Sequence, residues 1–142
     1  VGQGVVMANN ATLGGHVSVG EFAVLGGLAA VHQFCRIGRF AMIGGMSGVE
    51  GDVIPFGSVM GNRARLQGLN VVGLKRRDFS RDEVHALRYA YRLLFAEEGT
   101  MAERVQDVIG MYSDNEPVME IVRFIQADSA RAICQPGSGN AA

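Results

Sequence analysis

The chain has 142 residues, 48% of them hydrophobic and 19% charged, and a formal net charge of −1. No apolar run approaches the roughly 18 residues of a membrane-spanning helix, and no basic segment followed by an apolar one marks an export signal. Cys35 and Cys134 stand at unrelated places, which argues against a disulfide framework and favours a reducing cytoplasm.

An aliphatic residue returns at every sixth position through residues 1–54. The next residue is mostly glycine, and the residue four positions on is small or slim. This period fits neither a helix nor a simple alternating strand, but it is typical of the hexapeptide repeat of a parallel β-helix. Three hexads close one triangular coil, and successive coils stack about 4.8 Å apart. The aliphatic positions are Val1, Met7, Leu13, Val19, Leu25, Val31, Ile37, Ile43 and Val49.

The two ends of the repeat predict the domain organisation. The repeat is already in phase at Val1, and because a solenoid needs covered ends we expect further coils before it, which would make the chain a fragment. It stops at Pro55, which cannot donate to a ladder. We predict coils over 1–61, a crossing segment and helical domain over 62–131, and a flexible tail over 132–142.

Three amphipathic helices are predicted in the second region. Ser80 and Glu83 form a capping box before the first helix, and Gly99 is placed to end it. Thr100 opens a similar box for the second helix, and the third begins around Pro117. The three apolar stripes are Val84, Leu87, Tyr91 and Leu94; Val105, Val108, Ile109 and Tyr112; and Val118, Ile121, Val122 and Ile125.

Charge is unevenly distributed along the chain. Residues 63–92 contain eight basic and three acidic residues, whereas residues 93–142 contain three basic and eight acidic ones. The first stretch, at +5, could bind an acidic partner. Nucleic acid is a poor candidate, because aromatic residues do not alternate with the basic ones.

Residues three hexads apart stack directly above one another, which brings polar side chains together on one face. Gly15 lies below Gln33, His16 lies below Phe34, and His32 stands at the preceding corner. A neutral imidazole can accept a proton from a hydroxyl group or bind a sugar. These histidines could equally pack against a neighbouring subunit, and the pattern alone leaves both interpretations open.

The other two faces carry a glycine column and an aromatic column. Gly27 and Gly45 follow Asn9 in one column and leave a groove roughly 10 Å long, which could hold an alkyl chain or could serve close packing. Phe22 and Phe40 form a ladder that we expect at a subunit contact.

Four segments together resemble the UDP-N-acetylglucosamine O-acyltransferases, the cytoplasmic enzymes that begin lipid A synthesis. The likeness runs from Val1 to about Arg131, and its most specific part is the last segment. The segments are ANNATLGGHVSVG (8–20), GGLAAVHQFCRIG (26–38), GGMSGV (44–49) and NVVGLKRRDFS (70–80).

This resemblance implies a fold and an activity. The fold would be a left-handed parallel β-helix followed by a small helical domain, assembled as a homotrimer, with a handedness opposite to the usual crossover rule. An (R)-3-hydroxyacyl group would pass from acyl carrier protein to the 3-hydroxyl of UDP-N-acetylglucosamine, between subunits and without metal or cofactor.

The resemblance also implies roles for individual residues. The Gly15 backbone N–H would stabilise the thioester oxyanion, and Gly45 would stand where acyl-chain length is set. The +5 stretch would help to dock the acidic carrier protein. Residues implied to position the nucleotide sugar and acyl donor are Asn10, His16, His32 and Gln33, and those implied to contact substrate or its phosphates are Asn70, Arg76 and Arg77.

Three departures from the family pattern matter. The general-base histidine of the family would lie upstream of Val1, so we predict that the chain alone is inactive. Arg63 stands where the pattern favours histidine, and Val72 where it favours an acidic residue.

Other functions remain open from the sequence. The related N-acyltransferase and the acetyl-CoA-dependent transferases share the repeat. A metal hydratase would need three convergent histidines, but only His16 and His32 lie on the coil. A non-catalytic trimeric scaffold is the third alternative.

Overall fold

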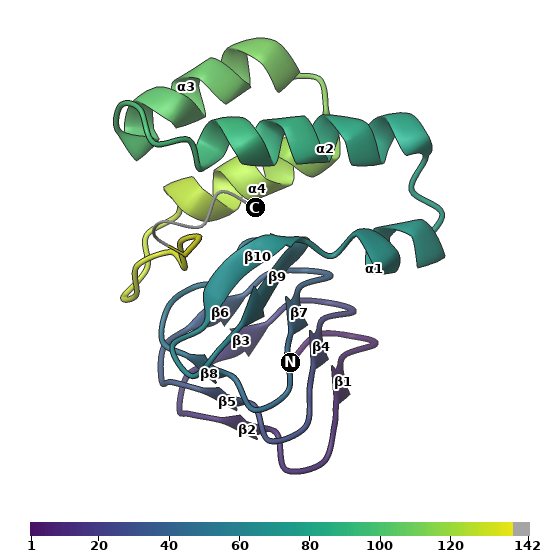
Figure 1. Cartoon of the computed structure of the whole chain (residues 1–142), viewed down its shortest axis with the longest axis vertical. Coiled ribbons are helices and arrows are strands. Elements are labelled where there is room, and N and C mark those ends of the chain that lie inside the picture. The colour runs from purple at the N-terminus through teal and green to yellow at the C-terminus, as the bar shows by residue number, and fades with distance from the viewer. Residues whose placement is uncertain (138–142) are drawn as a thin grey trace.

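The structure is a computed structural model that describes residues 1–137, and residues 138–142 of the predicted tail lie outside it. Short strands wind into stacked coils, and the helices lie together at one end of the stack (Figure 1). The strands are β1 Val6–Met7, β2 Thr12–Leu13, β3 Ser18–Val19, β4 Val24–Leu25, β5 Ala30–Val31, β6 Arg36–Ile37, β7 Met42–Ile43, β8 Gly48–Val49, β9 Gly57–Met60 and β10 Arg65–Leu69. The helices are α1 Val71–Arg76, α2 Arg81–Leu94, α3 Met101–Tyr112 and α4 Glu116–Gln126.

The predicted parallel β-helix is confirmed by the strand pairing. The three faces of the coil are the sheets β1-β4-β7-β9-β10, β2-β5-β8 and β3-β6. Val6 pairs with Val24 and Val24 with Met42, so each partner lies three hexads further along the chain. Inward aliphatic residues from Leu25 to Val49 are buried. Met7 is 39% exposed, because the first coil is covered on one side only.

The corners of the coil differ from the simple expectation that glycine makes the bend. A Cβ on Gly14 would lie 2.6 Å from the Gln33 nitrogen, and one on Gly38 would lie 2.3 Å from the Pro55 nitrogen. Glycine therefore stands there because the next coil passes too close for any side chain. The left-handed backbone conformation falls two positions later, mostly on bulky residues: Asn10, His16, Phe22, Leu28, Phe34, Phe40, Met46 and Phe56.

The repeat changes phase earlier than predicted. Gly48 still pairs with Ala30, three full hexads back, but Val53 pairs with Ile37 and Val59 pairs with Ile43. The partners in these last two pairs are separated by fewer residues than three full hexads. The last hexad, which the repeat predicts to run to residue 54, is therefore shortened. Fully buried Val53 takes the inward place due at Pro55.

The predicted crossing segment contains regular structure. β9 and β10 form an antiparallel hairpin, so the predicted boundary at residue 61 falls in its turn. The short helix α1 follows, and the Asn70 side chain accepts a hydrogen bond from the Gly73 N–H at its N-terminus.

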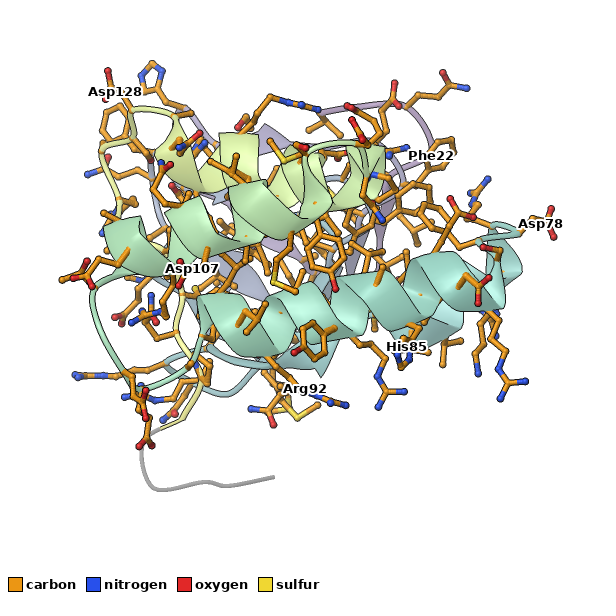
Figure 2. The ribbon with its side chains drawn as sticks, turned by 90° about the horizontal axis from the view of Figure 1, so that it is seen from above. Phe22, Asp78, His85, Arg92, Asp107 and Asp128 are labelled. Carbon is orange, nitrogen blue, oxygen red and sulfur yellow. The ribbon has the colours of Figure 1, made fainter. Side chains whose placement is uncertain are left out.

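The three long helices follow the capping signals. The Ser80–Glu83 capping box is present, the Thr100 side chain caps α3, and α4 starts at Glu116 with Asn115 as its cap. The prediction that Gly99 ends α2 is wrong, because the helix stops at Leu94 and Gly99 lies in the following loop. α2 packs against α3 and α4 (Figure 2), and one hydrophobic core continues from these helices into the coils.

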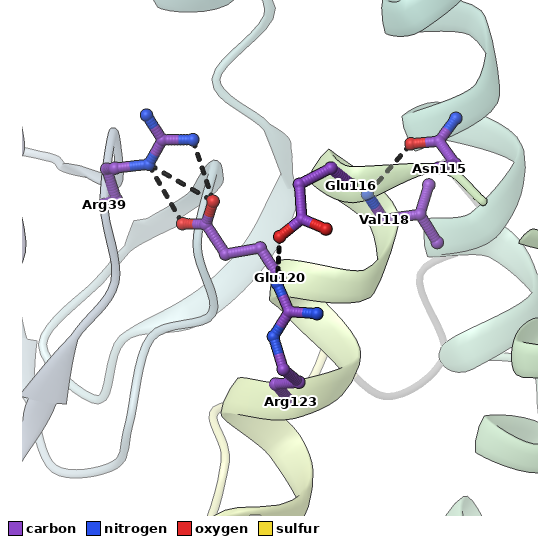
Figure 3. A network of polar contacts seen from close by, with 6 residues as sticks. All are labelled: Arg39, Asn115, Glu116, Val118, Glu120 and Arg123. Carbon is purple, nitrogen blue, oxygen red and sulfur yellow. Dashed lines mark hydrogen bonds and ion pairs between the residues drawn. The ribbon is translucent and has the colours of Figure 1, made fainter. Parts of the chain in front are cut away.

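Two charged contacts join the helical domain to the coils. Arg39 on the coil forms a two-pronged pair with Glu120 of α4 (Figure 3). Arg36 binds the buried carboxylate of Asp52 at 2.9 Å, and its guanidinium lies 4.0 Å above the Phe124 ring of α4.

Residues 129–135, which we call the C-terminal strap, run back from α4 onto the coil. Ile133 pairs with Asp52, and the Leu66 N–H donates to the Gln135 carbonyl. The prediction of a loose tail beginning at residue 132 is therefore wrong for 132–136, where backbone pairing and burial of Cys134 supply the order that side-chain hydrophobicity alone did not indicate.

Candidate functional site

The first corner that carries candidate residues joins two coils through ring stacking. The Phe34 N–H donates to the Gly15 carbonyl at 3.0 Å, as expected if Gln33 stacks above Gly15. The His16 and Phe34 rings stack with centroids 5.1 Å apart and an interplanar angle of 5°. Gly15, His16 and Gln33 are therefore brought together as predicted, and their side chains or backbone face solvent.

Gly15 differs from its neighbour Gly14 in having open space around it. No atom lies within 4 Å of the position that a Cβ would take. Within residues 1–137 the Gly15 N–H has no hydrogen-bond partner, whereas the Gly14 N–H donates to the Val31 carbonyl at 2.7 Å. An exposed, unpaired N–H held by a rigid coil can donate to an anionic oxygen.

His32 is also exposed at this corner. Its backbone is fixed by a 2.9 Å hydrogen bond from its N–H to the Val49 carbonyl, and its side chain is left facing solvent. On the same turn, the Gln33 carbonyl accepts a 3.0 Å hydrogen bond from the Arg131 Nε of the C-terminal strap. Sequence reasoning missed this contact because it joins positions 98 apart and Arg131 stands at the last position of the predicted helical domain.

The second corner carries the predicted glycine column. The Leu28 N–H donates to the Asn9 carbonyl and the Met46 N–H donates to the Gly27 carbonyl, so the stacking of residues 9, 27 and 45 is confirmed. Leu28 is 57% and Met46 74% exposed beside this column. Asn10 lies at the same corner, and the backbone surface of Gly45 is thus flanked by apolar side chains.

The third corner holds Asn70 and Arg77 against the aromatic ladder. Phe22, Phe40 and Phe56 stack in succession, with centroids 5.3 and 5.9 Å apart, so the predicted stacking of Phe22 on Phe40 is confirmed and extended. The expectation that this ladder forms a subunit contact is wrong for Phe40, which is only 5% exposed because Phe79 of the same chain packs against it. The Arg77 guanidinium lies 3.9 Å above the Phe22 ring. The Asn70 amide donates to the Phe40 carbonyl at 3.0 Å, and with its oxygen capping α1 it is committed to positioning that helix.

The candidate residues therefore occupy three corners of one prism. Gly15, His16 and Gln33 lie at one corner, Gly45 at the second, and Arg77 at the third. Arg76 is exposed near the end of α1. A single chain brings each group together but does not bring the three groups to one place.

A basic groove of about 500 Å³ between β10 and α2 was not predicted as a site. Arg88, Tyr91 and Arg92 line it from α2, and Leu69 lines it from β10. The sequence contained its signal, two arginines four positions apart within the +5 stretch. In Figure 2, His85 and Arg92 lie along the side of α2 that faces away from α3.

The buried cysteines are not activated nucleophiles. Burial raises the pKa of the Cys35 thiol, and it raises the pKa of Cys134 to about 11. Both groups are therefore protonated near neutral pH, and the fully buried Cys35 is a core residue.

Two further classes of site are absent from the described part of the chain. Across residues 1–137, no three His, Cys, Asp or Glu side chains are grouped so that they could hold a metal ion. No helix in the same range is long and apolar enough to cross a bilayer.

The fold and its surface define the chain as a hexapeptide-repeat β-helix protein with a helical C-terminal domain. The family described as UDP-N-acetylglucosamine O-acyltransferase, domain 2, matches residues 52–134. Because this match covers more than half of the chain, the chain belongs to the UDP-N-acetylglucosamine O-acyltransferase family.

Individual relatives agree with this assignment. An acyl-(acyl-carrier-protein)–UDP-N-acetylglucosamine O-acyltransferase of Caulobacter vibrioides is 58% identical over 136 residues, which cover 96% of this chain and 52% of the relative. One from Sinorhizobium fredii is 45% identical over 139 residues, covering 98% and 52%. The crystal structure of UDP-N-acetylglucosamine O-acyltransferase from Moraxella catarrhalis superposes with a TM-score of 0.90 at 33% identity, covering 95% of this chain and 52% of that one.

The chain therefore spans about half the length of the relatives it matches. The predicted fold class, a left-handed parallel β-helix followed by a small helical domain, is confirmed, as is the resemblance noted from the sequence.

Proposed function

We propose that the chain forms part of an acyltransferase that moves an (R)-3-hydroxyacyl group from acyl carrier protein to the 3-hydroxyl of UDP-N-acetylglucosamine, in the cytoplasm, at the start of lipid A synthesis. The observation that carries this proposal is the 58% identity to the Caulobacter vibrioides enzyme over 96% of the chain. Both substrates are part of that relative's name.

The open N–H of Gly15 suits the proposed chemistry. The sugar hydroxyl attacks the thioester carbon, its proton passes to a general base, and the carbon–sulfur bond breaks to release the carrier's thiol. Negative charge develops on the carbonyl oxygen during the attack, and a preorganised N–H stabilises it. The unobstructed space around Gly15 leaves room for that oxygen to approach.

The exposed side chains of the same corner would bind the substrates. His16, His32 and Gln33 offer hydrogen bonds to a sugar or to an amide of the acyl donor. Asn10, Asn70, Arg76 and Arg77 remain proposed contacts to substrate or phosphate. Asn70 would act through α1, since its amide oxygen caps that helix and its NH₂ group binds Phe40.

Distribution of these groups over three corners favours a homotrimer. If three copies pack side by side with their coils parallel, different corners of neighbouring copies face each other, and the groups that one chain keeps apart can form one site. The exposed apolar Leu28 and Met46 are surfaces that such packing would cover.

The glycine column would accept the acyl chain. Gly45 is exposed and lacks a side chain, and its flanking residues are apolar, so an extended alkyl group can lie against the backbone. Arg88 and Arg92 in the groove beside α2, together with the run 75–77, supply positive charge for docking an acidic carrier protein.

The test replaces the matching segment of the Caulobacter vibrioides relative with this chain and measures transfer from 3-hydroxyacyl carrier protein to UDP-N-acetylglucosamine. We expect activity in the chimera and none in the chain alone. Acetyl-CoA should not serve as donor. A folded chimera that transfers acetyl groups, or that transfers nothing while the unaltered relative is active, would contradict the proposal.

A second variant tests the acyl groove. Gly45→Met in the chimera should shorten the preferred acyl chain, because the new side chain covers the surface beside Gly27. Unchanged chain preference would show that this column is not the acyl channel. Gly110→Ala on α3 is the control, because a Cβ at that position would meet no atom within 4 Å. Gly61→Ala is unsuitable, because Gly61 has a φ of 113°.

A further inference from the structure

The C-terminal strap is paired to the coil through its backbone. The Asp52 N–H donates to the Ala132 carbonyl, and the Cys134 N–H donates to the Asp52 carbonyl, both at 2.8 Å. The strap thus adds one more short parallel bridge beside the coil that follows β8.

A buried carboxylate anchors the start of the strap. The Asp52 side chain is fully buried and accepts hydrogen bonds from the Arg36 N–H and Nε and from the Ser129 hydroxyl, at 2.8, 2.9 and 2.5 Å. The Ser129 oxygen also accepts a hydrogen bond from the Arg131 N–H at 3.3 Å. The backbone of Arg131 is therefore fixed independently of its side chain.

From this anchored position the Arg131 side chain reaches the candidate site. Its Nε donates to the Gln33 carbonyl at 3.0 Å, across 98 residues of sequence. That carbonyl belongs to the turn that carries His32 and Phe34, and Phe34 stacks on His16. This hydrogen bond lies at the surface, but a charged donor makes a stronger hydrogen bond to a carbonyl than a neutral one does.

We propose that Arg131 is a positioning residue that fixes the Gln33 peptide and thereby orients the side chains of His32, Gln33 and, through the Phe34 ring, His16. What this turn binds rests on the proposed function, but the positioning itself does not. Arg131 is distinct from the anchor, because Asp52 and Ser129 hold the strap without its guanidinium.

The first test uses the whole chain and Cys35 as a probe. Cys35 is fully buried two positions from Gln33, and in a Cys134→Ala background it is the only thiol of the sequence. Arg131→Met should raise the rate at which a thiol reagent labels Cys35 by about tenfold, the scale of one charge-assisted hydrogen bond. Arg131→Lys should restore slow labelling, since lysine keeps a charged donor.

Loss of the Arg131 charge would by itself slow the labelling of Cys35, so faster labelling cannot be an electrostatic effect. Burial raises the pKa of Cys35 and the charge of Arg131 lowers it, so loss of Arg131 would raise that pKa further and slow labelling. Faster labelling therefore reports opening of the turn. Arg123→Met is the matched control, because Arg123 is an exposed arginine of α4 paired with Glu116. An unchanged or slower rate in Arg131→Met would overturn the proposal.

The second test separates positioning from the proposed function. In the active chimera, Arg131→Met should raise KM for UDP-N-acetylglucosamine by about tenfold with a smaller change in kcat, and Arg131→Lys should recover most of the loss. Faster Cys35 labelling with an inactive chimera would support the positioning and count against the proposed function. Faster labelling with unchanged KM in an active chimera would overturn the role of Arg131 in orienting a substrate-binding turn.

Discussion

The coils and the helical domain are held together in different ways. In the coils, the same backbone hydrogen bonds recur at every turn, and the glycine that follows most inward aliphatic residues leaves room for the next coil to pass. In the helical domain, individual side chains cap each helix and pack into its neighbours. The coils therefore tolerate many different outward-facing side chains. The helical domain depends on side-chain caps and packing and not on the close approach of two backbones.

This difference explains where chemistry can be placed. Outward corner residues such as His16 and Phe34 contribute little to the backbone ladder, so their identity is free to serve binding. The helical domain instead supplies fixed charges, and it reaches the coil through Arg39–Glu120 and through the strap. The following changes probe the two modes of stabilisation, beginning with the junction between them.

Removing the buried carboxylate at the junction should have the largest effect. Asp52→Ala leaves the Arg36 guanidinium and the Ser129 hydroxyl without their partner, and we expect a loss of about 4 kcal/mol in the free energy of unfolding, measured by urea denaturation. Glu120→Ala, at a pair whose side chains are 36% and 25% exposed, should cost only about 1 kcal/mol. Equal losses in the two variants would contradict the expectation that the buried Asp52 contacts contribute more to stability than the more exposed Arg39–Glu120 pair.

Adjacent glycines test the geometry of the coils. Gly14→Ala should cost about 3 kcal/mol, because its methyl group would meet the Gln33 backbone at 2.6 Å, whereas Gly15→Ala should change stability by less than about 0.5 kcal/mol. Thermal unfolding of both variants measures the contrast. A stable Gly14→Ala protein would contradict the close approach of successive coils.

A cap tests the helical domain. Ser80→Ala removes the acceptor for the Glu83 N–H at 3.1 Å and should cost about 1 kcal/mol in urea denaturation. Ser113→Ala, at the C-terminal end of α3, is the matched control and should be nearly neutral. If both variants lose the same stability, the capping box is not the source.

Ionisation of Cys134 in the strap should have the smallest effect on the free energy of unfolding, and only in alkaline solution. Because burial raises the folded pKa of Cys134 to about 11 from an ordinary value of 9.0, the stability it contributes is complete below pH 9 and is lost as pH rises toward 11. At pH 9.5 the loss should be about 0.8 kcal/mol. Cys134→Ala, compared with the unaltered protein under reducing conditions, should show a shallower decline between these values; an identical decline would contradict burial of the thiol.

Much of the fold follows from the sequence because its signals are local and repeated. The sixth-residue period predicts the coil and the column partners, and Ser80, Thr100 and Pro117 mark the helix starts. The phase change at Val53 could not be predicted, since Val49 and Val53 both fit the repeat and only the pairing with Ile37 decides between them. The left-handed corner residues carry no compositional signal, because bulky side chains occupy them.

The candidate site was less accessible to sequence reasoning. Its columns could be computed, but the contact of Arg131 with Gln33 joins positions 98 apart through a segment without hydrophobic periodicity. Stacking of Arg77 on Phe22 likewise depends on where α1 settles after the hairpin. Contacts of this kind arise from tertiary packing and leave no local trace.

The ion pairs and the buried carboxylate that fasten α4 and the start of the strap are confined to a single coil, which favours a modular protein. Arg36, Arg39 and Asp52, which tie the helices and the strap, all lie within one turn of the spiral. Whole turns of three hexads, the unit that separates Val6 from its partner Val24, could be added or removed elsewhere in the stack and would leave these fastenings unchanged. The number of coils and the structure of the helical domain can therefore evolve, or be engineered, independently of each other.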